Sequence, residues 1–159
     1  MKKLLGLFAL LLMTNIVLSQ QIKKVKIGDV LKMIDTSTVP LVINFWASWC
    51  QPCVHEIPWF EKNIQPLESK GVKLILVSLD LQEDYPKALA SFVQKQNYRS
   101  TILWLDESNP NMFCPKIDRS WDGAIPVTLM VNNKKKYKQF FAQQLPEPRL
   151  KLELQKLLE

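Results

Sequence analysis

The stretch PLVINFWASWCQPC, residues 40–53, decides how the rest of the chain is interpreted. Residues 40–46 form a near-continuous β-prone run, which is typical of a central strand covered on both faces. Cys50 falls just beyond the end of this run. From Pro52 to about residue 69 apolar residues recur at helical spacing, and Gly71 follows as a stop. The stretch predicts a buried strand that leads into a helix, with Cys50 at the N-terminus of that helix.

The chain has three cysteines, Cys50, Cys53 and Cys114, so they cannot all pair internally. The two-residue gap between Cys50 and Cys53 closes a very small loop, which removes little entropy from the unfolded chain. The pair is therefore interpreted as reactive rather than structural. A helix N-terminus stabilises a thiolate, so we expect Cys50 to attack and Cys53, one turn later, to resolve the mixed disulfide.

Residues beside the pair suggest how it meets a partner. Pro52 suits the first turn of a helix and stiffens the bend. Trp46 and Trp49 flank the cysteines, and we expect both to supply apolar contact surface.

Outward from this stretch, strand and helix patterns alternate through the first two thirds of the chain. The predicted strands are residues 22–27, 40–46, 72–78, 101–105, 127–131 and 137–141, and the predicted helices are 28–34, 52–69, 84–97 and 147–158. Residues 106–116 carry Pro110, Pro115, two Asn and a Ser, and are interpreted as a loop. This order predicts an α/β fold in which a central mixed β-sheet has helices on both faces.

Composition excludes several classes of protein. The 159 residues are 47% hydrophobic and 23% charged, which suits one buried core and excludes a disordered chain. The net charge is +6, and its densest cluster, Lys134 to Lys136, follows two Asn residues in an expected hairpin turn. No basic face or motif indicates a nucleic-acid binder.

The N-terminus reads as a targeting segment. Lys2 and Lys3 precede an apolar run at residues 4–18, which predicts a secretory signal peptide at residues 1–19 and a mature domain at 20–159. An uncleaved anchor is the alternative, although this run spans only about 22 Å of a hydrocarbon core of about 30 Å. We expect the domain to lie outside the cytoplasm, either periplasmic or tethered to the membrane.

The segment from Phe45 to Cys53 resembles the active-site segment of thioredoxin-fold proteins, and of the exported TlpA/ResA-like branch in particular. Pro58 matches the proline that kinks the active-site helix of the family. Residues 125–128, Ile-Pro-Val-Thr, resemble the cis-proline segment that faces the cysteines. Glu56 matches a glutamate that ResA-like members place near the pair. Asn44 stands where thioredoxin carries a buried aspartate, a departure that favours the exported branch.

This resemblance implies a thioredoxin-like sandwich and thiol-disulfide exchange with exported proteins. Reduction is the usual direction in that branch, with electrons arriving from a membrane thiol carrier. The expected catalytic residues are Cys50, Cys53 and Glu56, and the expected substrate-binding residues are Trp49, Pro52, Ile125 and Pro126. No cofactor, metal or nucleic acid is expected.

Glu56 and Pro126 each have an expected role in the exchange reaction. Glu56 would take the proton of Cys53 as a general base, unless it is simply an exposed helix acid. A cis Pro126 would let Ile125 offer its backbone to an extended substrate segment by strand-like hydrogen bonds.

Other functions stay open at this point. A copper chaperone would use Cys50, Cys53 and His55 as ligands for Cu(I), but His55 fits a plain helix surface better. A peroxidase of the peroxiredoxin type is disfavoured, because those enzymes carry a threonine and a proline just before a single peroxidatic cysteine, whereas here Trp49 precedes Cys50. Cys114 is expected to be a buried or shielded loop thiol. The physiological substrate, the direction of exchange and the oligomeric state do not follow from the sequence.

Overall fold

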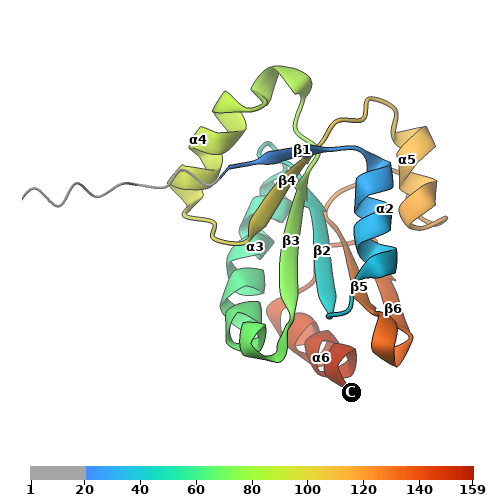
Figure 1. The fold of residues 1–159 in the computed structure, drawn as a ribbon. Coiled ribbons are helices and arrows are strands. Elements are labelled where there is room, and N and C mark those ends of the chain that lie inside the picture. The colour runs from blue at the N-terminus through green and yellow to red at the C-terminus, as the bar shows by residue number, and fades with distance from the viewer. Residues whose placement is uncertain (1–20) are drawn as a thin grey trace, which may run out of the picture.

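The computed structural model describes residues 21–159, so the signal peptide or anchor expected at residues 1–19 lies outside the described residues. A six-stranded sheet with the order β1-β4-β3-β2-β5-β6 forms the middle of the molecule (Figure 1). Its strands are β1 (Lys23–Val25), β2 (Leu41–Trp46), β3 (Lys73–Ser78), β4 (Thr101–Leu105), β5 (Val127–Asn132) and β6 (Tyr137–Phe141). Strands β1 to β4 are mutually parallel, whereas β5 and β6 are antiparallel to their neighbours, so the sheet is mixed as predicted.

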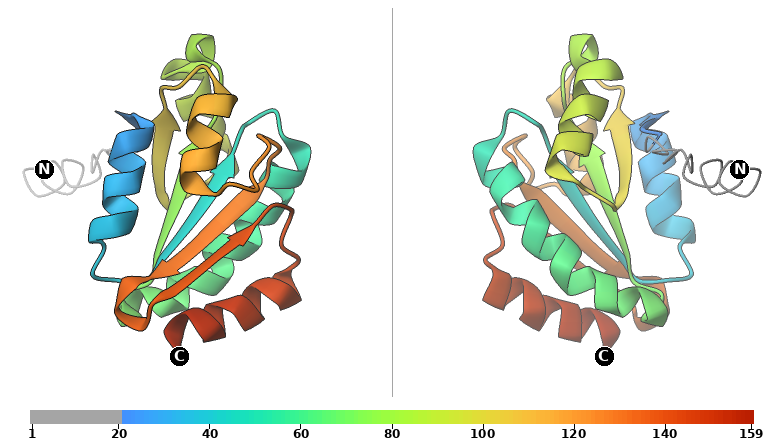
Figure 2. Two further views of the ribbon diagram at one scale, coloured as in Figure 1. Left: turned by 90° about the vertical axis from the view of Figure 1, so that its right-hand side faces the viewer. Right: turned by 90° about the vertical axis from the view of Figure 1, so that its left-hand side faces the viewer.

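Helices cover both faces of this sheet (Figure 2). One face carries α3 (Gln51–Ile64), α4 (Lys87–Gln96) and α6 (Glu147–Leu158), and the other carries α2 (Ile27–Thr36) and α5 (Pro110–Ile117). Short 3-10 turns complete the chain: η1 (Gln65–Lys70), η2 (Gln82–Asp84) and η3 (Asn133–Lys135). A separate apolar core fills the space on each side of the sheet, which confirms the predicted α/β architecture.

The central strand β2 is the best predicted element. All six of its residues are buried, because it pairs with β3 on one side and β5 on the other and is covered by helices above and below. Such a strand needs apolar residues on both faces, which is why the run is apolar except for Asn44. The first strand is shorter than residues 22–27, since α2 already begins at Ile27.

The helix expected over residues 52–69 changes character before its end. Its α-helical part, α3, stops at Ile64, and the continuation η1 has 3-10 geometry. Pro66 has no backbone N–H to donate four residues back, so one α-helical hydrogen bond is missing just after Ile64, where the tighter 3-10 geometry begins. Gly71, with φ of 85°, then ends the segment in the left-handed conformation, as its position predicted.

The loop expected at residues 106–116 is wrong, because residues 110–117 form the helix α5. The Asn109 side chain accepts a hydrogen bond from the Asn111 N–H at 3.1 Å and caps the helix, while Pro110 occupies its first turn. Pro115 lies within the helix and removes one internal hydrogen bond. The helix forms despite that loss because it buries an apolar face of Phe113, Cys114 and Ile117 against the sheet.

No helix within residues 21–159 combines the length and apolar character needed to cross a bilayer.

Candidate active site

Cys50 and Cys53 are joined by a disulfide bond at the start of α3. Strand β2 ends at Trp46, and a tight turn then places Cys50 at the N-cap, where its Sγ accepts a hydrogen bond from the Cys53 N–H at 3.3 Å. Cys50 keeps 6% of its surface exposed and Cys53 none. The structure thus confirms that Cys50 lies at a helix N-terminus, where unpaired amides and the helix dipole favour a thiolate. Cys50 is therefore the cysteine of the pair that solvent reaches.

The segment before β5 closes over the disulfide. The Ile125–Pro126 peptide bond is cis, as expected, and the Ile125 carbonyl oxygen lies 3.8 Å from the Cys50 Sγ. Antiparallel pairing of β2 with β5 produces this approach, because Phe45 faces Val127 across the ladder. Residues 75 positions apart in the sequence therefore meet at the reactive sulfur. Ile125 is half-buried, and Pro126 is buried.

The two tryptophans beside the pair behave differently. Trp49 is 59% exposed and Pro52 is exposed, so both are available to a partner. The expectation that Trp46 supplies contact surface is wrong, because its side chain is fully buried. Trp46 packs edge-on against Tyr98, with ring centroids 5.6 Å apart. It closes a fully covered strand and belongs to the core.

Glu56 lies within the protein, and the alternative of an exposed helix acid is wrong. It is fully buried one helical turn after Cys53, on the same face of α3. Its Oε1 accepts a hydrogen bond from Asn44 Nδ2 at 2.8 Å, and its Oε2 accepts one from the Leu145 N–H at 2.9 Å. Burial raises the pKa of Glu56 from 4.5 to about 7, although both hydrogen bonds oppose that rise. The carboxyl group can therefore both take up and release a proton near neutral pH.

Asn44 links Glu56 to the cis-proline strand. Its Nδ2 also donates to the Thr128 hydroxyl at 3.0 Å, two residues after Pro126. Its Oδ1 is buried and has no hydrogen-bond partner among the described residues. A chain of polar contacts thus joins β5, β2, α3 and the segment before α6. The sequence carries no signal for the Leu145 contact, because the donor is a backbone amide.

Asp80 is a further residue that the sequence reasoning missed. It follows β3, is 4% exposed, and both of its carboxylate oxygens accept hydrogen bonds from the Ser48 N–H, at 3.0 and 3.2 Å. An acidic residue two positions after a buried strand was the available signal, since the ends of neighbouring parallel strands meet at one edge of the sheet.

His55 and Cys114 lie apart from this arrangement. His55 is exposed, and its ring packs edge-on against Trp59 with centroids 5.0 Å apart. Cys114 is a buried free thiol on α5, and burial, with a smaller contribution from Asp122, raises its pKa to about 11. Within residues 21–159, no three or more His, Cys, Asp or Glu side chains form a group that could hold a metal ion.

Comparison with known proteins places this geometry in a family. A model of the AhpC/TSA family matches residues 14–140. The thiol-disulfide oxidoreductase ResA of Oceanobacillus iheyensis is 40% identical over 55 residues, which cover 30% of this chain and 29% of that protein. The sporulation thiol-disulfide oxidoreductase A of Bacillus subtilis is 34% identical over 62 residues, covering 39% of this chain and 38% of the relative. The chain thus spans well under half the length of either relative.

A solved structure supports the architecture. The thioredoxin-related protein from Neisseria meningitidis serogroup B superposes with a TM-score of 0.65 and 20% identity, covering 79% of this chain and 90% of that protein. At that level of identity the match establishes the thioredoxin-like fold and nothing further.

Proposed function

The chain belongs to the AhpC/TSA family, and from that premise we propose that it is an extracytoplasmic thiol-disulfide oxidoreductase that reduces protein disulfides through Cys50 and Cys53. The observation that carries the proposal is the disulfide at the N-terminus of α3. The sulfur of Cys50, the more exposed of the two cysteines, lies beside the backbone carbonyl of Ile125. The names of the curated relatives, which are thiol-disulfide oxidoreductases, support the same activity.

The reaction starts from the dithiol form. The Cys50 thiolate attacks one sulfur of a substrate disulfide, forms a mixed disulfide, and expels the other substrate sulfur as a thiolate. The Cys53 thiolate then attacks the Cys50 Sγ and releases the second substrate sulfur. Two electrons pass to the substrate, and the protein is left with the Cys50–Cys53 disulfide seen in the structure. A thiol donor must reduce this disulfide before the next turnover.

Glu56 is proposed as the base for the second step. Cys53 is fully buried, so bulk solvent does not reach its side chain to take the proton. Glu56 follows one turn later on the same helix face, and its pKa of about 7 lets the carboxylate accept a proton near neutral pH. Its hydrogen bonds to Asn44 and Leu145 fix its orientation in both steps.

The substrate segment is proposed to lie along Ile125. Its backbone stands beside the Cys50 Sγ, so an extended segment can pair with it by main-chain hydrogen bonds while its own sulfur faces Cys50. Trp49 and Pro52, which flank Cys50 in the sequence, offer exposed apolar surface. Pro126 fixes the direction of the strand. Main-chain recognition of this kind accommodates many protein sequences.

Location and electron supply complete the proposal. Residues 1–19 are proposed to be a signal peptide or anchor that exports the domain of residues 20–159, with a membrane thiol carrier as the donor. These parts rest on the apolar N-terminal run and on the resemblance to the exported branch.

Turnover of a protein disulfide tests the proposal. With dithiothreitol as the electron source, the purified protein is expected to accelerate reduction of insulin, and Cys50→Ser is expected to abolish this rate. Cys53→Ser is expected to accumulate a mixed disulfide at Cys50, visible as a mass adduct, while Cys114→Ser serves as the matched control and retains the full rate.

Three results would contradict the proposal. The first is an unchanged rate in Cys50→Ser. The second is tight Cu(I) binding by both cysteines without disulfide exchange. The third is peroxide consumption by the protein with no thiol partner present.

A further inference from the structure

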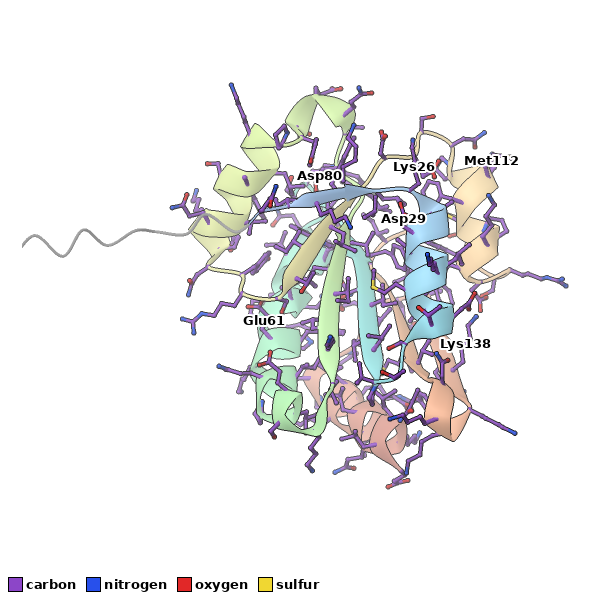
Figure 3. The ribbon with its side chains drawn as sticks, viewed as in Figure 1. Lys26, Asp29, Glu61, Asp80, Met112 and Lys138 are labelled. Atoms are coloured by element: carbon purple, nitrogen blue, oxygen red, sulfur yellow. A yellow bond between two sulfur atoms is a disulfide. The ribbon has the colours of Figure 1, made fainter. Side chains whose placement is uncertain are left out.

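Asp80 lies at the edge of the sheet where β2 and β3 end (Figure 3). The disulfide at the start of α3 follows β2 at the same edge. Its carboxylate is almost fully buried and is held by neutral donors. The Ser48 N–H donates to both oxygens, the Ser48 hydroxyl donates to Oδ1, and the Ser78 hydroxyl donates to Oδ2 at 2.6 Å. These donors suit a carboxylate, whose oxygens accept hydrogen bonds.

These contacts fix the turn that bears Cys50. Ser48 lies two residues before Cys50, and the Cys50 N–H donates to the Ala47 carbonyl at 3.1 Å, so the turn is tight. The backbone of Asp80 is itself held, because its carbonyl accepts from Trp104 Nε1 at 2.8 Å. Strand β4 thus supports Asp80, and Asp80 supports the turn.

The charge of Asp80 has no cationic partner nearby. Of the ion pairs among residues 21–159, none includes Asp80. Serine hydroxyls and one amide satisfy its hydrogen bonds without neutralising it. In a buried setting, where water screens little, such a charge acts over longer distances than at the surface.

The effect on Cys50 opposes that of the helix N-terminus. The helix stabilises a thiolate at Cys50, and a negative charge held by the turn at Ser48, two residues before Cys50, destabilises it. A pair whose reduced form is stabilised is a strong oxidant, so a less stable thiolate moves the equilibrium towards the disulfide. A pair that prefers the disulfide gives up its electrons readily.

We propose that Asp80 is a positioning residue that holds the Cys50 turn and places a buried negative charge behind it, which biases the pair towards donating electrons. This inference rests on the proposed function and adds the physical basis of its direction.

The test compares Asp80→Asn with Asp35→Asn in the full-length protein. Asn keeps the shape and one acceptor oxygen of Asp80 but removes its charge. Asp35 is exposed at the end of α2, so its variant makes the same charge change away from the pair. For each protein the equilibrium between dithiol and disulfide is measured against glutathione by alkylation and mass spectrometry, and the pKa of the Cys50 thiol by the pH dependence of alkylation.

Asp80→Asn is expected to move the equilibrium about tenfold towards the dithiol and to lower the pKa of Cys50, while Asp35→Asn stays within about twofold of the wild type. Ser48→Ala removes a hydroxyl donor and keeps the charge, so it is expected to show no movement towards the dithiol. An equal shift in Asp80→Asn and Ser48→Ala would show a loosened turn instead of a charge effect and would overturn the proposal. An unchanged equilibrium in Asp80→Asn would also overturn it.

A second pair of variants covers the case in which Asp80→Asn does not fold. Leu81 is 55% exposed next to Asp80, so Leu81→Lys and Leu81→Glu change the local charge without touching the buried contacts. Lys is expected to move the equilibrium towards the dithiol and Glu away from it, and identical equilibria in the two would refute the inference. If the wild-type pair does not exchange at all, the proposed function itself fails, which is a separate result.

Discussion

Replacing Glu56 by Gln is expected to remove a pH dependence from the stability of the fold. The unfolded chain releases the proton of Glu56 near pH 4.5, whereas the folded protein holds it up to about pH 7. Between these values the folded state binds more protons, so stability falls as pH rises through this window. The shift corresponds to a loss of about 3 kcal/mol in the free energy of unfolding. This loss is absent below pH 4.5 and complete above pH 7. A glutamine at this position never ionises and avoids that loss.

The variant preserves the local contacts. The Gln carbonyl can accept from the Leu145 N–H in place of Oε2, and its NH₂ group then faces Asn44. Rotating the Asn44 amide turns its Oδ1 towards this donor, and the Thr128 hydroxyl, which accepts from Asn44 Nδ2 in the wild type, can then donate to the same Oδ1. The two proteins should therefore have similar stability at pH 4.5.

The assay is urea unfolding of the oxidised protein at several pH values from 4.5 to 8. The free energy of unfolding of Glu56→Gln minus that of the wild type is expected to rise by about 3 kcal/mol across this range. Glu68→Gln, an exposed change on η1, is the matched control. A difference that stays constant within about 0.5 kcal/mol would refute the argument that burial dominates at Glu56.

Three further predictions concern single side chains. Cys114 is buried with its pKa raised to about 11, so native protein is expected to resist iodoacetamide at pH 8 until it unfolds; rapid native labelling would contradict this. Trp49→Ala should change unfolding free energy by under about 0.5 kcal/mol, yet raise the KM for a protein disulfide and leave the rate with oxidised glutathione intact. Trp59→Phe deletes the hydrogen bond from Nε1 to the Leu145 carbonyl, 2.9 Å long, and should cost about 1 kcal/mol in urea unfolding; no measurable loss would show that this bond does not stabilise the fold.

The fold was predictable where the signal is local. Strand β2 was predictable from a run that is apolar except for Asn44, and α6 from a regular amphipathic pattern that the structure reproduces over Glu147–Leu158. Helix α5 was missed because Pro and Asn are ordinarily loop signals, whereas here Asn109 caps a helix and Pro110 begins it. Whether Pro and Asn start a helix or form a loop here depends on the apolar face that α5 buries against the sheet. That face depends on tertiary packing.

The motifs of the site were predictable from the sequence, but the hydrogen bonds between its residues were not. The position of the Cys50–Cys53 pair at a helix N-terminus followed from the residue pattern, and the cis geometry at Pro126 was implied by the family resemblance. The burial of Glu56 did not, because it depends on Asn44 and on a backbone amide 89 residues away. Asp80 escaped notice for the same reason, since its contact with Ser48 exists only once β2 and β3 lie side by side.

The central claim is that Cys50 and Cys53 form a pair that donates electrons to protein disulfides. Its most direct test is the reduction potential of the pair in the purified protein, measured by alkylation and mass spectrometry across a series of defined thiol buffers. We predict a single two-electron transition at about −250 mV or below, in the range of thioredoxin-like reductants. A value near about −120 mV would make the protein a disulfide donor, and a pair that does not exchange with any buffer would contradict the enzymatic function itself.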